Sequence, residues 1–197
     1  VAGMIATLQK ESGEIPWHVD GKTDPWDLVE SIMGLNIGGY YPESRLAFNW
    51  LKENQNPDGS WFSSYVAGEP QDRTCETHMA CYIAVGLFHS YLITRDISLL
   101  DQYWPTLERG VCFALSLQTP TGEIFWAKSP EGKVDPMSLL AGSSSIFMSL
   151  KCALAIAAAL VPPLATVGIA LTHGDLSVAK GAAILFTTNM VSIILGA

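Results

Sequence analysis

Aspartate residues stand at the start of predicted helices in three places along the chain. Asp24, Asp72 and Asp135 each precede a run of apolar residues with helical spacing. Aspartate is a preferred N-cap residue, because its carboxylate accepts hydrogen bonds from the first backbone N–H groups of a helix. Capping alone would therefore explain these three residues, and this interpretation competes with a catalytic one.

Further groups capable of acid–base chemistry follow the first two aspartates. Asp27 and Glu30 follow Asp24, and His78 follows Asp72. Carboxylates beside an aromatic-lined cavity could bind a cation, protonate an alkene or hydrolyse a glycosidic bond. Alternatively, acids in a first helical turn only stabilise the helix dipole. The candidate catalytic residues are Asp24, Asp27, Glu30, Asp72 and His78.

Cysteine and histidine offer one weak indication of a metal site. Cys75 and His78 have the C-x-x-H spacing that occurs in zinc sites, but no fourth ligand accompanies them. We therefore expect neither a bound metal nor a cofactor. The four cysteines form no C-x-x-C pair and lie mostly in apolar helical runs, which predicts reduced, buried thiols.

Tryptophan side chains are the candidates for contact with a substrate. Their rings present large flat apolar faces, which could form a cage around an apolar substrate such as an isoprenoid. The alternative, which the sequence favours, is packing at the joints between repeated units. The four residues are Trp17, Trp26, Trp61 and Trp126.

A glutamine–glycine motif occurs three times, as QKESGEIPW, QNPDGSWF and QTPTGEIFW. The intervals between the three copies are of the order found in repeat architectures. Glycine can adopt the positive φ at which a helix ends, and a glutamine amide can satisfy backbone groups left open there. We therefore expect structural roles for Gln9, Gly13, Gln55, Gly59, Trp61, Gln118 and Gly122.

Helical patterns surround these motifs in a regular order. Amphipathic runs in residues 42–54 and 103–117 precede the second and third motifs. Each unit reads as a helix, a glutamine, a glycine turn, an aromatic residue, a short loop and a second helix opened by aspartate. One helix pair cannot bury its own apolar face, so such units stack. The sequence predicts an all-α fold of stacked helical hairpins.

The second motif carries a resemblance to a known family. Ala47, Trp50 and Leu51, ahead of Gln55, complete a pattern that resembles the QW motif of squalene–hopene cyclases and the wider prenyltransferase and squalene-oxidase-repeat superfamily. The resemblance covers about residues 1–157. It implies an α/α toroid whose inner helices run parallel around a cavity, and about three hairpins of the expected set are present, so we expect a partial toroid. The D-x-D-D and D-D-x-x-D motifs of those enzymes are absent.

The C-terminal part of the sequence has almost no charge. Nine Lys and Arg face eighteen Asp and Glu up to residue 150, whereas the rest of the chain holds two lysines and one aspartate. Two apolar runs, about 152–171 and 181–197, are long enough to form a transmembrane helical hairpin. The predicted domains are an incomplete toroid at 1–151 and a membrane segment at 152–197.

This tail also resembles a second family. Residues 153–197 are similar to an uncharacterised family of hydrophobic bacterial multi-span membrane proteins, and the two resemblances meet near residues 151–158. This predicts a fusion or a chimera, located in the bacterial inner membrane with its repeat domain in the cytoplasm. The net charge of −8 excludes nucleic acid as a partner, because phosphate binding needs a basic surface.

Three functions are compatible with these observations. The first is a fragment or fusion resembling a terpenoid cyclase or prenyltransferase that takes an isoprenoid, inactive on its own. The second is a glycan-processing toroid that uses the carboxylates at its rim, and a carboxylate separation suited to glycosidases would distinguish it. The third is a membrane-anchored protein without enzymatic activity. The expected partners are the lipid bilayer, a small isoprenoid or glycan, and further copies that complete the ring.

Overall fold

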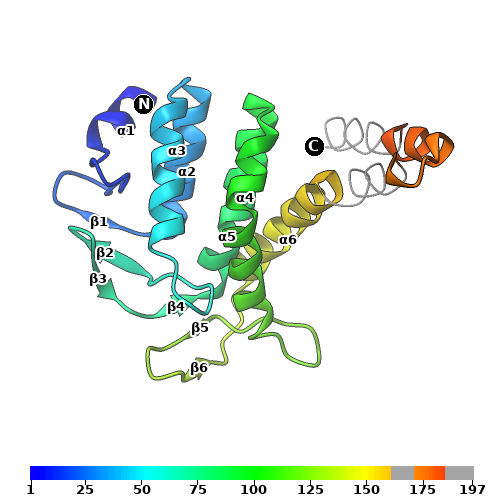
Figure 1. Cartoon of the computed structure of the whole chain (residues 1–197). Coiled ribbons are helices and arrows are strands. Elements are labelled where there is room, and N and C mark those ends of the chain that lie inside the picture. The colour runs from blue at the N-terminus through cyan, green and yellow to red at the C-terminus, as the bar shows by residue number, and fades with distance from the viewer. Residues whose placement is uncertain (161–170, 185–197) are drawn as a thin grey trace. The chain divides into compact units, whose positions relative to one another are not determined.

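The computed structural model describes residues 1–160 and 171–184, which are mostly helical, as predicted, with two small antiparallel sheets (Figure 1). The chain divides into two compact units, Val1–Leu150 and Lys151–Ala197. The helices are α1 (Ala2–Leu8), α2 (Pro25–Ile37), α3 (Tyr41–Glu53), α4 (Thr77–Thr94), α5 (Ile97–Leu115) and α6 (Leu140–Leu160). The strands are β1 (Lys22–Thr23), β2 (Ser64–Val66), β3 (Glu69–Asp72), β4 (Cys75–Glu76), β5 (Ala127–Lys128) and β6 (Val134–Asp135).

Helix α2 begins where the sequence predicts. The Asp24 Oδ1 accepts a hydrogen bond from the backbone N–H of Asp27 at 2.9 Å, and Pro25 occupies the first turn. Proline suits this position because its missing N–H would have no partner inside the helix. Leu28 and Ile32, one turn apart, are fully buried and face the core. The cap therefore fixes which face of α2 is buried.

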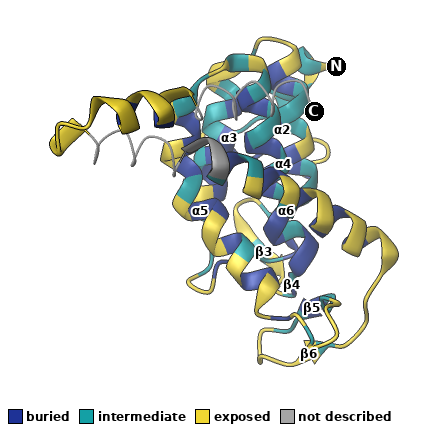
Figure 2. Cartoon of the chain, turned by 90° about the vertical axis from the view of Figure 1, so that its right-hand side faces the viewer, coloured by how far each residue is buried: buried dark blue, intermediate teal, exposed yellow. Residues whose placement is uncertain are grey.

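Helix α4 packs against both α2 and α5 in the first unit. It is apolar on most of its faces and mostly buried or half-buried (Figure 2), as expected for a helix with neighbours on several sides. Gly86 allows a close approach, since a Cβ atom there would lie 2.8 Å from Val29 of α2. Near the other end of the pair, the Asn36 Nδ2 donates a hydrogen bond of 2.7 Å to the Ser90 Oγ. These two contacts follow in the same order along both helices, so α2 and α4 run parallel.

The second glutamine–glycine turn, which follows α3, is tied to α5. The Gln55 Nε2 donates to the carbonyl oxygen of Gly59 at 3.0 Å and to that of Thr106, in α5, at 2.8 Å. Gly59 has a φ of +92°, and a Cβ atom there would overlap the carbonyl oxygen of Arg109. The turn therefore requires glycine both for its backbone conformation and for its contact with α5.

The first turn repeats this arrangement one hairpin earlier. The Gln9 Nε2 donates to the carbonyl oxygen of Gly13 at 3.2 Å and to that of Glu43, in α3, at 2.9 Å. Gly13 also has a φ of +92°, and a Cβ atom there would overlap the carbonyl oxygen of Leu46. Gln9 thus ties its turn to α3, and Gln55 ties its turn to α5.

Short antiparallel sheets occupy connections that the sequence predicts as loops. β2 pairs with β1 and β3 in one sheet, and β5 pairs with β4 and β6 in the other. Each sheet joins strands from different repeats, because β1 comes before α2 and β2 after α3. The sheets therefore link neighbouring hairpins on the side where α2 and α4 begin.

Asp72 and Asp135 do not open helices, and this prediction is wrong. Asp72 ends β3 and accepts a hydrogen bond from the Thr74 backbone N–H at 2.9 Å. Asp135 ends β6 and accepts from the Met137 N–H at 3.0 Å. The residue that precedes α4 is Glu76. An aspartate followed by a turn looks the same in sequence whether a strand or a helix adjoins it, because the local hydrogen bond is similar.

Helix α6 contains a stretch, Leu140–Ala157, that is long and apolar enough to cross a membrane, and 39% of this stretch is buried. Within residues 1–160 and 171–184 it is the one helix that meets these criteria. Core helices of soluble proteins have the same length and composition, so this is weak evidence for a membrane location. The spans predicted at about 152–171 and 181–197 fall largely outside the described residues, and the transmembrane hairpin is therefore unconfirmed.

Replacing Gly59 by alanine should destabilise the chain far more than replacing Gly68. Both have a positive φ, which costs an alanine about 1–2 kcal/mol, but only Gly59 lacks space for a methyl group. We expect the free energy of unfolding, measured by urea denaturation, to fall by about 1 kcal/mol for Gly68→Ala. For Gly59→Ala we expect a loss of about 3 kcal/mol or more. Equal losses would contradict the close contact between this turn and α5.

Candidate functional site

Carboxylates and aromatic rings meet at the N-terminal ends of α2 and α4. Asp24 is buried there, and both of its carboxylate oxygens are engaged. Its Oδ2 accepts a hydrogen bond of 2.9 Å from the Trp17 Nε1, while its Oδ1 caps the helix at the N–H of Asp27. These bonds hold the Asp24 carboxylate in one orientation next to the Asp27 side chain.

The Asp27 carboxyl group has a raised pKa. Burial raises its pKa to about 6, and the neighbouring Asp24 adds to the rise through its charge and a carboxyl–carboxyl hydrogen bond. Glu30 raises the pKa further, whereas Lys22 opposes the shift. Two carboxylates this close repel each other when both are ionised, so Asp27 holds its proton up to about pH 6. Asp27 can therefore donate a proton in mildly acidic solution.

Four rings form a continuous row across the repeats, which we term the aromatic row: Tyr82, Trp26, His78 and Trp126. Trp26 stacks on Tyr82 with ring centroids 4.0 Å apart and planes at 4°. His78 lies 5.0 Å from Trp26 and stacks on Trp126 at 4.3 Å. The row thus connects α2, α4 and the strand β5 that follows the third glutamine turn.

Glu30 is tied to the aromatic row by two hydrogen bonds. Its Oε1 accepts from the Trp26 Nε1 at 2.8 Å and from the Tyr82 hydroxyl at 3.4 Å. The side chain is exposed, one turn further along α2 than Asp27. Residues at this spacing are neighbours on a helix surface. The site therefore presents a second, oriented carboxylate beside Asp27.

His78 is neutral in this environment. Burial lowers its pKa to about 4, and the charge of Asp24 only partly opposes this. Its Nδ1 lies 3.5 Å from the Glu76 Oε2, which is too long for a good hydrogen bond, and the neutral ring makes this a contact and not an ion pair. Burial also raises the pKa of Glu76, which accepts a hydrogen bond from Ser63. His78 thus contributes a flat ring to the row and not a charge.

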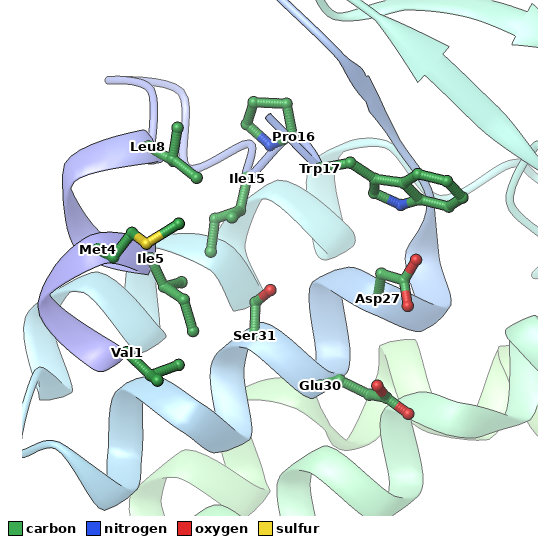
Figure 3. A pocket seen from close by; sticks show the side chains of 10 residues that line it. All are labelled: Val1, Met4, Ile5, Leu8, Ile15, Pro16, Trp17, Asp27, Glu30 and Ser31. Carbon is green, nitrogen blue, oxygen red and sulfur yellow. The ribbon is translucent and has the colours of Figure 1, made fainter. Parts of the chain in front are cut away.

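A cavity of about 510 Å³ opens beside these carboxylates (Figure 3). Trp17 and Asp27 lie toward one end, and apolar side chains of α1 form the other. Trp17 is 53% exposed, with the Lys22 Nζ 3.9 Å from its ring centroid. The lining residues are Val1, Met4, Ile5, Leu8, Ile15, Pro16, Trp17, Asp27, Glu30 and Ser31. The cavity therefore combines a polar, acidic end with an apolar end.

The structure gathers most of the candidate residues but not all. Asp24, Asp27, Glu30 and His78 lie together, as do Trp17, Trp26 and Trp126. Asp72 is exposed at the end of β3 and reaches this group only through its effect on the pKa of Glu76. Trp61 lies in the core, 1% exposed, where its Nε1 donates to the Leu51 carbonyl oxygen at 2.7 Å.

Two residues of the site were missed at the level of sequence. Glu76 precedes α4 as Asp24 precedes α2, and Tyr82 occupies the α4 position that corresponds to Glu30. Aligning the starts of α2 and α4 identifies these two residues, because counterparts in the two helices are separated by one fixed interval. The same alignment pairs Trp26 with His78. In the part of the chain that the structure describes, no three His, Cys, Asp or Glu side chains are grouped as a metal site would need.

Known proteins with similar sequences fall into two groups. A family described as a domain of unknown function (DUF389) matches residues 131–195. The MMP endo-(1,4)-3-O-methyl-alpha-D-mannosidase of Mycolicibacterium hassiacum is 40% identical over 156 residues, which are 79% of this chain and 43% of that protein. An uncharacterized glycosyl hydrolase of Methanocaldococcus jannaschii is 31% identical over 64 residues, 32% of this chain and 10% of its own length. The chain thus spans less than half of the mannosidase and about a tenth of the hydrolase.

These relatives overturn the expected membership in the prenyltransferase and squalene-cyclase superfamily. The similar proteins are named as a mannosidase and a glycosyl hydrolase, so the terpenoid cyclase or prenyltransferase function is wrong as well. A glutamine–glycine turn between helices satisfies a packing need that is independent of the substrate, and its presence therefore does not distinguish these families. The DUF389 match begins at residue 131, earlier than the position near residue 153 at which the second resemblance begins.

Replacing Asp27 by asparagine should change how stability depends on pH. The pKa of Asp27 is about 6 in the folded chain against an ordinary value of 3.8. The folded state therefore binds this proton more tightly than the unfolded state, and the resulting stability is complete below about pH 3.8 and lost as the pH rises through about 6. Asparagine remains neutral, so Asp27→Asn should match the wild type near pH 4 and be more stable at pH 7.5.

Thermal melts at both pH values would measure this difference. Asp101→Asn, at an exposed position of α5, serves as the control. The difference in melting temperature between Asp27→Asn and the wild type should be larger at pH 7.5 than near pH 4. If this difference is the same at both pH values, the carboxyl pair does not hold a proton.

Proposed function

We propose that this chain is the saccharide-binding and proton-donating part of a glycan-processing protein, acting on an α-linked, methylated mannoside. The observation that carries the proposal is the Asp24–Asp27 carboxyl pair, with one pKa near 6, beside the aromatic row and an open cavity. Glycosidases need one carboxylic acid that keeps its proton and a second carboxylate that acts as base or nucleophile. The names of the two relatives support this class of reaction.

The residues take distinct roles in the proposed reaction. Asp27 protonates the leaving glycosidic oxygen, because it holds a proton up to about pH 6 and lines the cavity. Asp24 positions it, since both Asp24 oxygens are already bound and are not free to reach a substrate. Glu30 acts as the second carboxylate, oriented by the Trp26 indole N–H. Proton transfer by a positioned carboxylic acid contributes a factor of about 10² to 10⁴ to the rate.

The lining of the cavity suits a sugar with a methylated hydroxyl group. Pyranose rings have apolar C–H faces, which pack on aromatic rings, and Trp17 offers an exposed indole beside the acids. At the other end, Met4 and Leu8 of α1 provide apolar contacts for a methyl ether. The mannosidase relative is named for a 3-O-methyl mannoside, and we assign the same substrate class to this chain.

We further propose that the hairpins form part of an α/α toroid. The support is the parallel pair α2 and α4, whose N-termini share the site, together with outer helices tied to the preceding turns by Gln9 and Gln55. Parallel inner helices place equivalent positions at one end of the ring, which is where the carboxylates and aromatic rings lie. The chain's share of the mannosidase relative, 43%, corresponds to part of such a ring.

Binding of a short α-(1,4)-linked 3-O-methylmannoside tests this proposal. We expect the ligand to change tryptophan fluorescence, and Trp17→Ala to weaken its affinity at least tenfold through loss of the exposed ring. Trp50→Phe, in the core, is the matched control for loss of an indole. Where hydrolysis is measurable, Asp27→Asn should lower kcat by about 10²-fold or more, with binding retained, and the wild-type rate should fall as the pH rises through about 6.

Two results would contradict the proposal. One is the absence of binding by methylated mannosides to the folded chain. The other is a hydrolysis rate that does not change in Asp27→Asn, which would show that the proton comes from a different group.

A further inference from the structure

The third hairpin turn corresponds to the second in its sequence and in the helix that follows it. Gln118 and Gly122 correspond to Gln55 and Gly59. The start of α6, Leu140, follows Gln118 by the same interval as the start of α4, Thr77, follows Gln55. Positions in the two units can therefore be compared one by one.

The face that α5 covers in the second hairpin is only partly covered in the third: Ile146 is buried against Cys81 and Ala114, whereas Ser143 and Phe147 are exposed. In α4, the four residues at this face are buried, with at most 1% of their surface exposed: Ala80, Ile83, Ala84 and Leu87. Their counterparts in α6 are Ser143, Ile146, Phe147 and Leu150, which line a cavity of about 200 Å³ together with Gln118, Gly122, Glu123 and Ile124. Phe147 is 62% exposed, whereas its counterpart Ala84 is fully buried. Below, these eight lining residues are called the third-hairpin face.

The hydrogen bonds of the third turn are also incomplete relative to the first two. Among the contacts within the described residues, the Gln118 Nε2 donates to the Gly122 carbonyl oxygen at 2.9 Å and has no second acceptor of the kind that Gln9 and Gln55 have. A Cβ atom at Gly122 would meet no described atom within 4 Å, although its φ is +106°. Gly122 thus has the positive φ of Gly13 and Gly59. The space that α3 and α5 occupy next to those two glycines is open next to Gly122 among the described residues.

The outer helices α3 and α5 show what this face accepts. The carbonyl oxygens that accept from Gln9 and Gln55 belong to Glu43 and Thr106. Each of these two residues follows a proline, and each precedes the next glutamine of the series by the same interval. The residues that contact Gly13 and Gly59 come three positions later in both helices. A helix that binds in this way is therefore amphipathic and has a proline just before the carbonyl that accepts from the glutamine. Its backbone carbonyl three residues later lies against the glycine of the turn.

We propose that the third-hairpin face is a docking surface for an amphipathic helix of the α5 type, with a backbone carbonyl acceptor one residue after a proline. The incoming helix gives Gln118 its second acceptor and places a backbone carbonyl against Gly122. It also covers the exposed Phe147 and the exposed part of Leu150. Lipid would cover the apolar side chains equally well, but hydrocarbon offers no acceptor for the glutamine amide. This inference does not depend on the substrate of the carboxylate site.

The probe is a fluorescent peptide with the sequence of residues 96–118, which contains α5 and its aspartate cap. Its binding to the full chain in phosphatidylcholine nanodiscs is measured by fluorescence anisotropy. We expect saturable binding that Gly122→Ala weakens at least tenfold, because the new methyl group occupies the space of the peptide backbone. Gly132→Ala is the matched control: Gly132 also has a positive φ, +83°, and open space, but lies in the β5–β6 turn.

Two further variants separate docking from general effects on folding. Gln118→Ala removes one hydrogen bond, worth about 1 kcal/mol, and should weaken binding about fivefold. A peptide with leucine in place of Gly110 should not bind, because in α5 a Cβ at this position already overlaps the carbonyl oxygen of Ala80, the counterpart of Ser143.

Several outcomes would overturn the proposal. These are the absence of peptide binding, equal losses in Gly122→Ala and Gly132→Ala, and undiminished binding of the leucine peptide. A blue-shifted emission of a Phe147→Trp variant in nanodiscs, unchanged by peptide, would show that lipid covers the face instead.

Discussion

The side-chain amide of Gln55 is the interaction on which the arrangement of the hairpins depends. It joins the turn after one hairpin, at Gly59, to helix α5 of the next, at Thr106, and Gln9 makes the same connection one hairpin earlier. A glutamine can do this because its amide carries two donor hydrogens at a fixed angle. The bridge stacks successive hairpins in one register, so that α2 and α4 run side by side in the same direction.

The chemistry of the site follows from that parallel arrangement. Helix N-termini stabilise negative charge, and an acidic residue precedes each of the two parallel helices, Asp24 at α2 and Glu76 at α4. Several acids close together cannot all be ionised, and burial adds to the cost of their charge. Asp27 therefore has a pKa of about 6 and keeps its proton in mildly acidic solution. The aromatic row lies next to it because Trp26 and His78 occupy equivalent helix positions.

Sequence predicted the parts of this structure that depend on local hydrogen bonds and periodicity. The helical hairpins and the cap at Asp24 are of this kind, since each involves residues within one or two turns of each other. The two sheets were missed because their strands are very short and pair across repeats, so no local pattern marks them. The predicted helix start at Asp72 is wrong because the turn at this residue follows a short strand, β3, that no local pattern marks. Glu76 and Tyr82 required the structural alignment of α4 with α2.

The pKa of Asp27 is the most direct test of this account of the site. We would record the side-chain carboxyl carbon by NMR while titrating the chain between pH 3 and pH 8, with Asp24→Asn for comparison. The account predicts a midpoint near 6 for Asp27, and a lower midpoint in Asp24→Asn because a neighbouring negative charge is lost. A midpoint close to the ordinary value of 3.8 would contradict it, since Asp27 would then be ionised and unable to donate a proton.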